Sequence, residues 1–233
     1  MSDQPPSSAP QMLKALVARD VHLALRGGGG WLQTLFFFLI FIGLSGFALG
    51  PGAAALRAAA PAIIWLGLLL AVQFSVLDLF RSDMEDGTLQ VLCAEHKSLL
   101  PYVFARLVTA FITLALPLAL IVPLAFVMFS VPVGGAVPAA LLLMAASPAL
   151  IIAGVVAAAV SASARTGGLL GMGLAAPLVV PVLIFGIGTV EAGLSPAASQ
   201  WVSPQTLLLL ALTLFYGVVL PPFAVLAIRL GLE

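Results

Sequence analysis

The chain has 233 residues, of which 62% are hydrophobic and only 8% charged, whereas soluble domains carry about one quarter charged residues. Nine basic and nine acidic side chains are too few to cover a soluble domain of this length, so lipid must be its solvent. A formal net charge of zero argues against nucleic acid as a partner. The single cysteine, Cys93, excludes an internal disulfide.

The N-terminal region divides into two parts. Residues 1–10 are rich in Pro and Ser and predict a disordered tail. Residues 11–26 predict a basic amphipathic helix on the membrane surface, because apolar residues fall on one side at about 100° per residue. The basic side carries Lys14, Arg19, His22 and Arg26.

Two features qualify this interfacial helix. Asp20 intrudes on the apolar side, so the pattern is imperfect. An ordinary extension of the first membrane helix is the alternative, but the glycines of residues 27–30 should break a helix there.

Six later segments are long and apolar enough to cross a bilayer, which needs about 20 residues of helix. A membrane barrel would instead show shorter segments of alternating polarity. We therefore expect an all-α membrane protein with six transmembrane helices in a single domain, residues 11–233. The expected spans are about 31–49, 61–80, 101–130, 137–160, 168–189 and 206–230.

Basic residues orient these spans. With the N-terminus in the cytoplasm, only Arg57 lies on the outer side, which is a strong positive-inside pattern. Both termini are then cytoplasmic. The residues on or near the cytoplasmic side are Lys14, Arg19, Arg26, Arg81, Lys97, Arg106, Arg165 and Arg229.

The cytoplasmic connection after the second span, residues 81–98, is called the acidic segment here. Asp83, Glu85 and Asp86 stand within four residues. Each charge would cost about 2.5–3.5 kcal/mol at the bilayer centre, so the three lie outside it.

Leucines follow these carboxylates at helical spacing. After Gly87, residues Leu89, Leu92 and Cys93 recur at i, i+3 and i+4. A polar loop with a turn and a short helix that presents an apolar face to a partner both fit this spacing.

Catalytic motifs are missing. No Gly-x-x-x-x-Gly-Lys-Ser/Thr motif occurs, so this chain does not hold ATP phosphates in a P-loop. Asp83-x-x-Asp86-Gly87 resembles the start of the metal motif of membrane CDP-alcohol phosphotransferases. Gln90 and Val91 replace the Ala-Arg of that motif, and no aspartate follows Asp86, so the metal site could not be completed.

Four motifs, in their order and spacing, carry a more specific resemblance. They are "PAIIW" at 61–65, "LFRSDMEDGTLQ" at 79–90, "RTGGLL" at 165–170 and "APLVVPVLIFG" at 176–186. With the amphipathic helix and six spans, the chain resembles the membrane subunit of a type-2 ABC exporter and, more closely, the CcmB family of haem exporter proteins for cytochrome c maturation. Gln90, where the family more often has Glu, and "CAEHKS" at 93–98 depart from the family pattern.

The resemblance implies a bacterial inner-membrane complex that handles haem. ATP would bind a separate ABC ATPase subunit, and this chain would hold no cofactor directly. It also implies two copies of this chain, a tryptophan-rich haem-handling membrane subunit and a small accessory membrane subunit. Haem export and release of a haem-loaded chaperone both remain open, and a type-2 permease for a lipid, drug or polysaccharide is the alternative.

The resemblance further implies that the acidic segment is the contact for the ATPase, with the interfacial helix (Lys14, Arg19, Arg26) second. The expected contact residues are Asp83, Glu85, Asp86, Gly87, Thr88, Leu89, Gln90 and Leu92.

Overall fold

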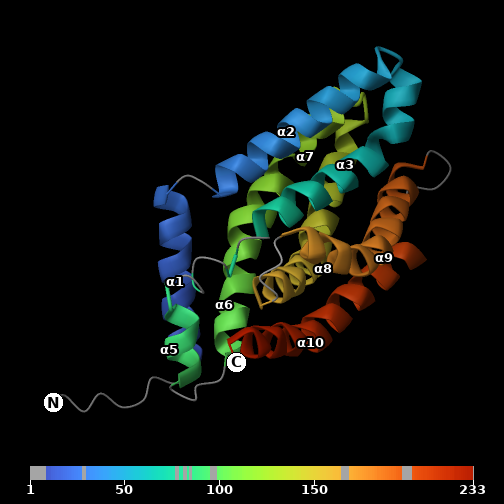
Figure 1. Cartoon of the computed structure of the whole chain (residues 1–233). Helices are drawn as coiled ribbons and strands as arrows, with labels where there is room; N and C mark the ends of the chain where they lie inside the picture. The colour runs from blue at the N-terminus through green and yellow to red at the C-terminus, as the bar shows by residue number, and fades with distance from the viewer. Residues whose placement is uncertain are drawn as a thin grey trace.

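The computed structural model is built of helices alone in the part of the chain that it describes. Figure 1 shows a bundle of long helices, with the shorter α1 (Ala9–Gly27) standing beside α6 (Leu100–Ala110). α1 begins inside the expected tail of residues 1–10, with Pro10 in its first turn, where proline is tolerated. The described residues are 9–27, 30–76, 79–80, 83, 86–94, 99–163, 168–195 and 201–232.

Within the residues that the structure describes, six helices are long and apolar enough to cross a membrane, so the predicted fold class is confirmed. The third of them is continuous from Leu100 to Met128 but contains a turn of π-helix, η1 (Phe111–Ala115). A short 3-10 turn, η2 (Val133–Gly135), precedes the fourth. The spans are α2 (Gly30–Leu49), α3 (Ala53–Val76), α6–η1–α7 (with α7 Leu116–Met128), α8 (Ala136–Ser163), α9 (Gly168–Leu194) and α10 (Pro204–Leu232).

α8 occupies the centre of the bundle and packs against α3, α7, α9 and α10. Its buried face is largely alanine, and such small side chains let membrane helices approach closely. α2 and α10 instead leave large apolar side chains exposed, Phe47 and Val218 among them. Those outer faces suit contact with lipid, because hydrocarbon solvates them without cost.

Two glycines receive large side chains of α3. A Cβ at Gly186 of α9 would lie 2.6 Å from the indole of Trp65, and one at Gly154 of α8 would lie 2.4 Å from Cγ2 of Val76. Trp65 and Val76 are fully buried. The absence of a side chain at Gly154 and Gly186 therefore lets α3 sit against α8 and α9.

Proline within a helix leaves a carbonyl without its usual donor. Pro148 of α8 does so for Met144, and the hydroxyl of Ser147 donates to that carbonyl at 3.0 Å. Such side-chain donors make proline tolerable in a medium without water. α8 therefore continues through Pro148 without a break.

We predict that Gly186→Ala destabilises the bundle by roughly 1–3 kcal/mol, because the rigid indole of Trp65 must shift. The matched change Gly43→Ala, whose Cβ would meet only Met128 at 3.8 Å, should be neutral or slightly stabilising. The measurement is the fraction of detergent-solubilised protein that stays monodisperse after heating. Equal losses in both variants would contradict the close approach at Gly186.

Candidate functional site

One end of the bundle, called the charged end here, gathers α1, the acidic segment, the start of α6 and the end of α10. Figure 1 shows the C-terminal end of α10 beside the start of α6, and these two helices are in contact. Of the predicted contact residues, Glu85 lies outside the described residues, as does the side chain of Leu92.

The acidic segment contains a short helix, α5 (Thr88–Ala94). Gly87 precedes it with a φ of +76°, a left-handed conformation that suits glycine, and its carbonyl accepts from the Val91 N–H at 3.2 Å. Of the two arrangements that the sequence left open, the structure has the short helix, with a turn at Asp86 and Gly87 before it.

Two apolar side chains anchor the acidic segment, one immediately before it and one within it. Phe80 and Leu89 are fully buried and belong to the core of the chain. Asp86 and Gln90 are exposed, and Val91 is 59% exposed. In this conformation Leu89 is thus unavailable to a partner, contrary to its predicted place on a contact surface, while Val91, which the sequence did not single out, is available.

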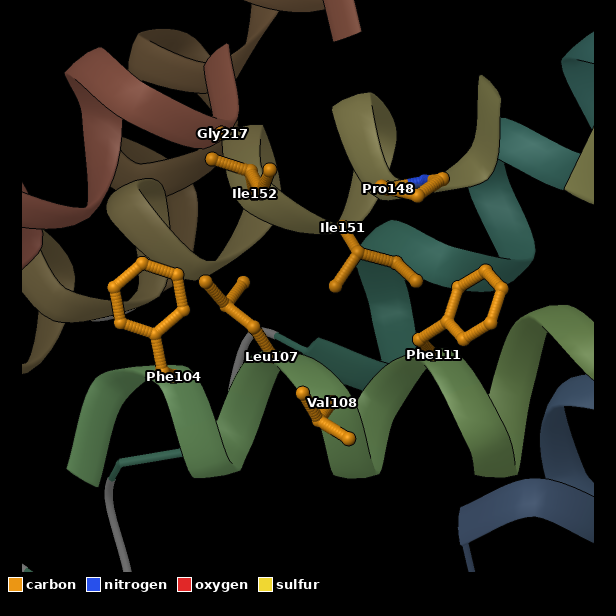
Figure 2. A pocket seen from close by; sticks show the side chains of 8 residues that line it. All are labelled: Phe104, Leu107, Val108, Phe111, Pro148, Ile151, Ile152 and Gly217. Atoms are coloured by element: carbon orange, nitrogen blue, oxygen red, sulfur yellow. The ribbon is translucent and has the colours of Figure 1, made fainter. Parts of the chain in front are cut away.

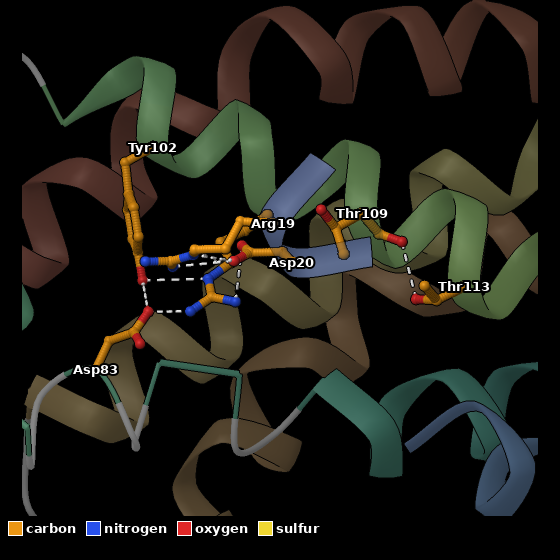
Figure 3. Close-up of polar contacts among 7 residues, drawn as sticks. Arg19, Asp20, Asp83, Tyr102, Thr109 and Thr113 are labelled. Carbon is orange, nitrogen blue, oxygen red and sulfur yellow. Dashed lines mark hydrogen bonds and ion pairs between the residues drawn. The ribbon is translucent and has the colours of Figure 1, made fainter. Parts of the chain in front are cut away.

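Asp83 also points inward, into a cluster centred on Arg106 of α6. Its carboxylate accepts from the Tyr102 hydroxyl and from Nη2 of Arg106. Nη1 of Arg106 lies 3.0 Å from Oδ2 of Asp20 on α1, and its Nε donates to the Tyr102 hydroxyl at 3.2 Å. Arg19 adds a second contact to Asp20, at 2.9 Å. These five residues are called the Arg106 cluster, and Figure 3 shows Asp20, Asp83 and Tyr102 converging from separate elements.

Charge balance explains how the Arg106 cluster can be buried. Two aspartates offset two arginines, so its formal charge is zero. The side chains of Arg106, Asp20 and Asp83 are only 13%, 4% and 12% exposed, whereas that of Arg19 is 50% exposed. A planar guanidinium offers donors in several directions, which suits a bridge between two carboxylates. Arg106 therefore ties α1 and the acidic segment to the third span.

The Arg106 cluster also accounts for Asp20, the residue that broke the apolar pattern of α1. α1 packs along α6, and Asp20 faces Arg106 from that side. Lys14, Arg19 and Arg26 are exposed, as the amphipathic pattern predicted. The sequence did not single out Tyr102 or Arg106 as site residues, although an aromatic hydroxyl and a guanidinium four residues apart at the start of a span were a usable signal.

In the described residues of the charged end, the buried polar side chains bond to one another. Among them, no group of three or more His, Cys, Asp and Glu side chains could hold a metal ion. The carboxylates of the Arg106 cluster are occupied by Arg and Tyr donors. The arrangement links three segments, α1, the acidic segment and α6.

The fold and this charged end define a multi-pass membrane subunit whose polar connection is braced by ion pairs. The model of the CcmB protein family matches residues 11–231, and the chain belongs to that family. It is 36% identical to "Heme exporter protein B" of Bradyrhizobium diazoefficiens over 95% of this chain and 99% of the relative. The proteins of that name from Rhodobacter capsulatus and Paracoccus denitrificans are 38% and 39% identical, over 95% of this chain and their full length.

We predict that Arg106→Gln lowers the free energy of unfolding by about 3 kcal/mol, because Asp20 and Asp83 then lose their shared counter-charge. Arg19→Gln is the matched control and should cost less than about 1 kcal/mol, since Arg19 is half exposed. Thermal unfolding in detergent measures the loss, and limited proteolysis measures release of α1. Similar effects of the two changes would contradict a central role for Arg106.

Proposed function

We propose that this chain is the membrane-spanning subunit of an ABC exporter complex for cytochrome c maturation, residing in the bacterial inner membrane. The observation that carries the proposal is the full-length match to proteins named "Heme exporter protein B". A permease for a lipid, drug or polysaccharide is not favoured by these relatives. The complex would handle haem, by export or by release of a haem-loaded chaperone.

The ATPase of this complex would be a separate chain, in keeping with the missing P-loop motif. Its docking surface would be the exposed part of the acidic segment around Asp86, Gln90 and Val91, together with Glu85. Asp86 supplies an exposed carboxylate and Val91 an exposed apolar side chain, and both kinds of group occur in protein contacts. Thr88 and Gly87 would shape the turn that presents this surface.

Movement of the docked ATPase would reach the bilayer through the inward-facing residues. Phe80 and Leu89 fix the acidic segment in the core, so it would shift as a unit with the end of α3. Asp83 would pull on Arg106 and Tyr102, and through Arg106 on α1. The second and third spans would respond together, while α1 stays at the cytoplasmic membrane surface.

The remaining parts of the proposal concern assembly. Two copies of this chain would associate with two ATPase subunits, a tryptophan-rich haem-handling membrane subunit and a small accessory subunit. Both termini would be cytoplasmic. The structure supports this orientation in that α1, the acidic segment and the end of α10 share the charged end (Figure 1).

Charge reversal at Glu85 and Asp86 should lower copurification of the ATPase with this chain, because the docking surface loses its carboxylates. Glu191→Lys is the control, since Glu191 is exposed near the far end of α9. The measurement is the amount of ATPase recovered with the affinity-tagged chain from solubilised membranes. Undiminished recovery and normal ATPase coupling in the Glu85→Lys, Asp86→Lys double variant would refute the docking surface.

Deletion of the gene should abolish c-type cytochromes and leave b-type cytochromes intact, because only c-type maturation needs this complex. Haem staining of membrane proteins measures the c-type group, and reduced-minus-oxidised spectra measure the b-type group. Normal c-type levels in the deletion strain would instead favour a permease for another cargo.

A further inference from the structure

The third span is two helical arms joined by a π-helical turn. The N–H of Leu116 donates to the carbonyl of Phe111, five residues back, and the N–H of Phe111 is shared between the carbonyls of Leu107 and Val108. A π turn holds one residue more than the α-helix around it and is often found at functional positions. α6 therefore meets α7 at a local irregularity in the hydrogen-bond ladder.

The sequence weakens the ladder further at this turn. Pro117 offers no N–H to the carbonyl of Thr113, four residues before it. The Thr113 hydroxyl donates at 2.8 Å to the carbonyl of Thr109, a bond known to bend helices. The Thr109 hydroxyl is buried and has no hydrogen-bond partner. Bending costs least where backbone bonds are already compromised.

An apolar cavity of about 220 Å³ lies beside α6, on its face toward the centre of the bundle. Figure 2 shows Phe104, Leu107 and Phe111 rising from one helix toward Ile151 and Ile152 on α8. The cavity is open to the outside of the bundle, since Phe104 and Val108, which line it, are 37% and 39% exposed. Part of this face of α6 is therefore separated from α8 by open space.

The Arg106 cluster is attached to the same arm. Tyr102 and Arg106 belong to α6, which precedes the π turn in the chain. They are hydrogen-bonded or ion-paired to Asp83 of the acidic segment, and Arg106 also to Asp20 of α1. α6 is thus bonded to two other segments at its charged end, ends in an irregular π turn at η1, and has open space along one side. We propose that α6 is a lever that swings about η1 into this cavity, toward α8, while α7 stays fixed.

Spin-label distances test the lever in the full chain in lipid nanodiscs, with Cys93→Ser as background. One pair joins the arm to α9, Leu100→Cys with Val180→Cys, and the control pair joins α7 to the same site, Leu120→Cys with Val180→Cys. All three positions are exposed. The arm pair should show a broader or divided distance distribution and the control pair a single narrow one.

Deletion of Ile112 should remove the extra residue of the π turn and restore a regular α-helix with its two ends in phase. The distance distribution of the arm pair should then become single and narrow. If the arm and control pairs are equally narrow in the native chain, both alone and with ATPase and nucleotide, the lever does not exist.

Filling the cavity gives a second test. Gly217 of α10 lines it, and a Cβ there would meet no atom within 4 Å, so the side chain of Gly217→Leu would begin in open space. Gly46→Leu on α2 has equally open surroundings and is the matched control. Gly217→Leu should narrow the arm-pair distribution and reduce c-type cytochrome formation several-fold, with ATPase copurification unchanged.

An unchanged arm-pair distribution in Gly217→Leu would mean that the cavity is not the space into which α6 moves, as when a lipid chain permanently fills it. The movement of α6 is a property of this chain alone, whereas the ATPase that would drive it belongs to the proposed function. Copurification with the Asp86→Lys variant tests whether the ATPase docks, and the spin-label distances test whether α6 moves. A failure of either proposal is therefore recognised separately.

Discussion

A guanidinium at the edge of a bilayer must keep its hydrogen bonds and find a counter-charge, since partial burial removes water that would otherwise solvate it. Arg106 meets this need from two segments that are remote in sequence, with Asp20 on α1 and Asp83 in the acidic segment. Tyr102 supplies a third polar contact on the same helix. Arg106 thereby links α1 and the acidic segment to α6, in addition to the packing of α1 along α6 and the burial of Leu89.

The apolar part of the molecule obeys a different constraint. Lipid provides no hydrophobic force between helices, so close packing must hold them together. The alanine face of α8 and the glycines opposite Trp65 and Val76 supply that packing. Within the described residues, the third span also contains a π turn and borders an open apolar cavity.

Outward-facing and inward-facing side chains alternate within a few residues of the acidic segment. Asp86 and Val91 face outward, whereas Asp83 and Leu89 face inward. A partner that gripped the outward side would thus act on residues already fixed to the bundle. This division would separate two effects of mutation: changes at Asp86 would alter the proposed docking, and changes at Asp83 would alter contacts within the chain.

The fold class could be predicted from the sequence because membrane insertion is governed by local properties. Runs of apolar residues specify spans, and the amphipathic pattern specifies α1, without knowledge of any tertiary contact. The resemblance to the CcmB family likewise needed only the order of short motifs. The acidic segment could be placed outside the bilayer by the cost of burying its charges.

The Arg106 cluster and the cavity were decided by tertiary structure. Asp20 looked like a flaw in an apolar face until Arg106, 86 positions later, was found opposite it. Leu89 looked like a contact residue, but its helical spacing did not say which side of α5 would face the core. The sequence by itself thus determined which segments enter the membrane, since that is a property of each segment alone. Which side chains meet at the charged end depended on how the helices pack, because those partners are far apart in the chain.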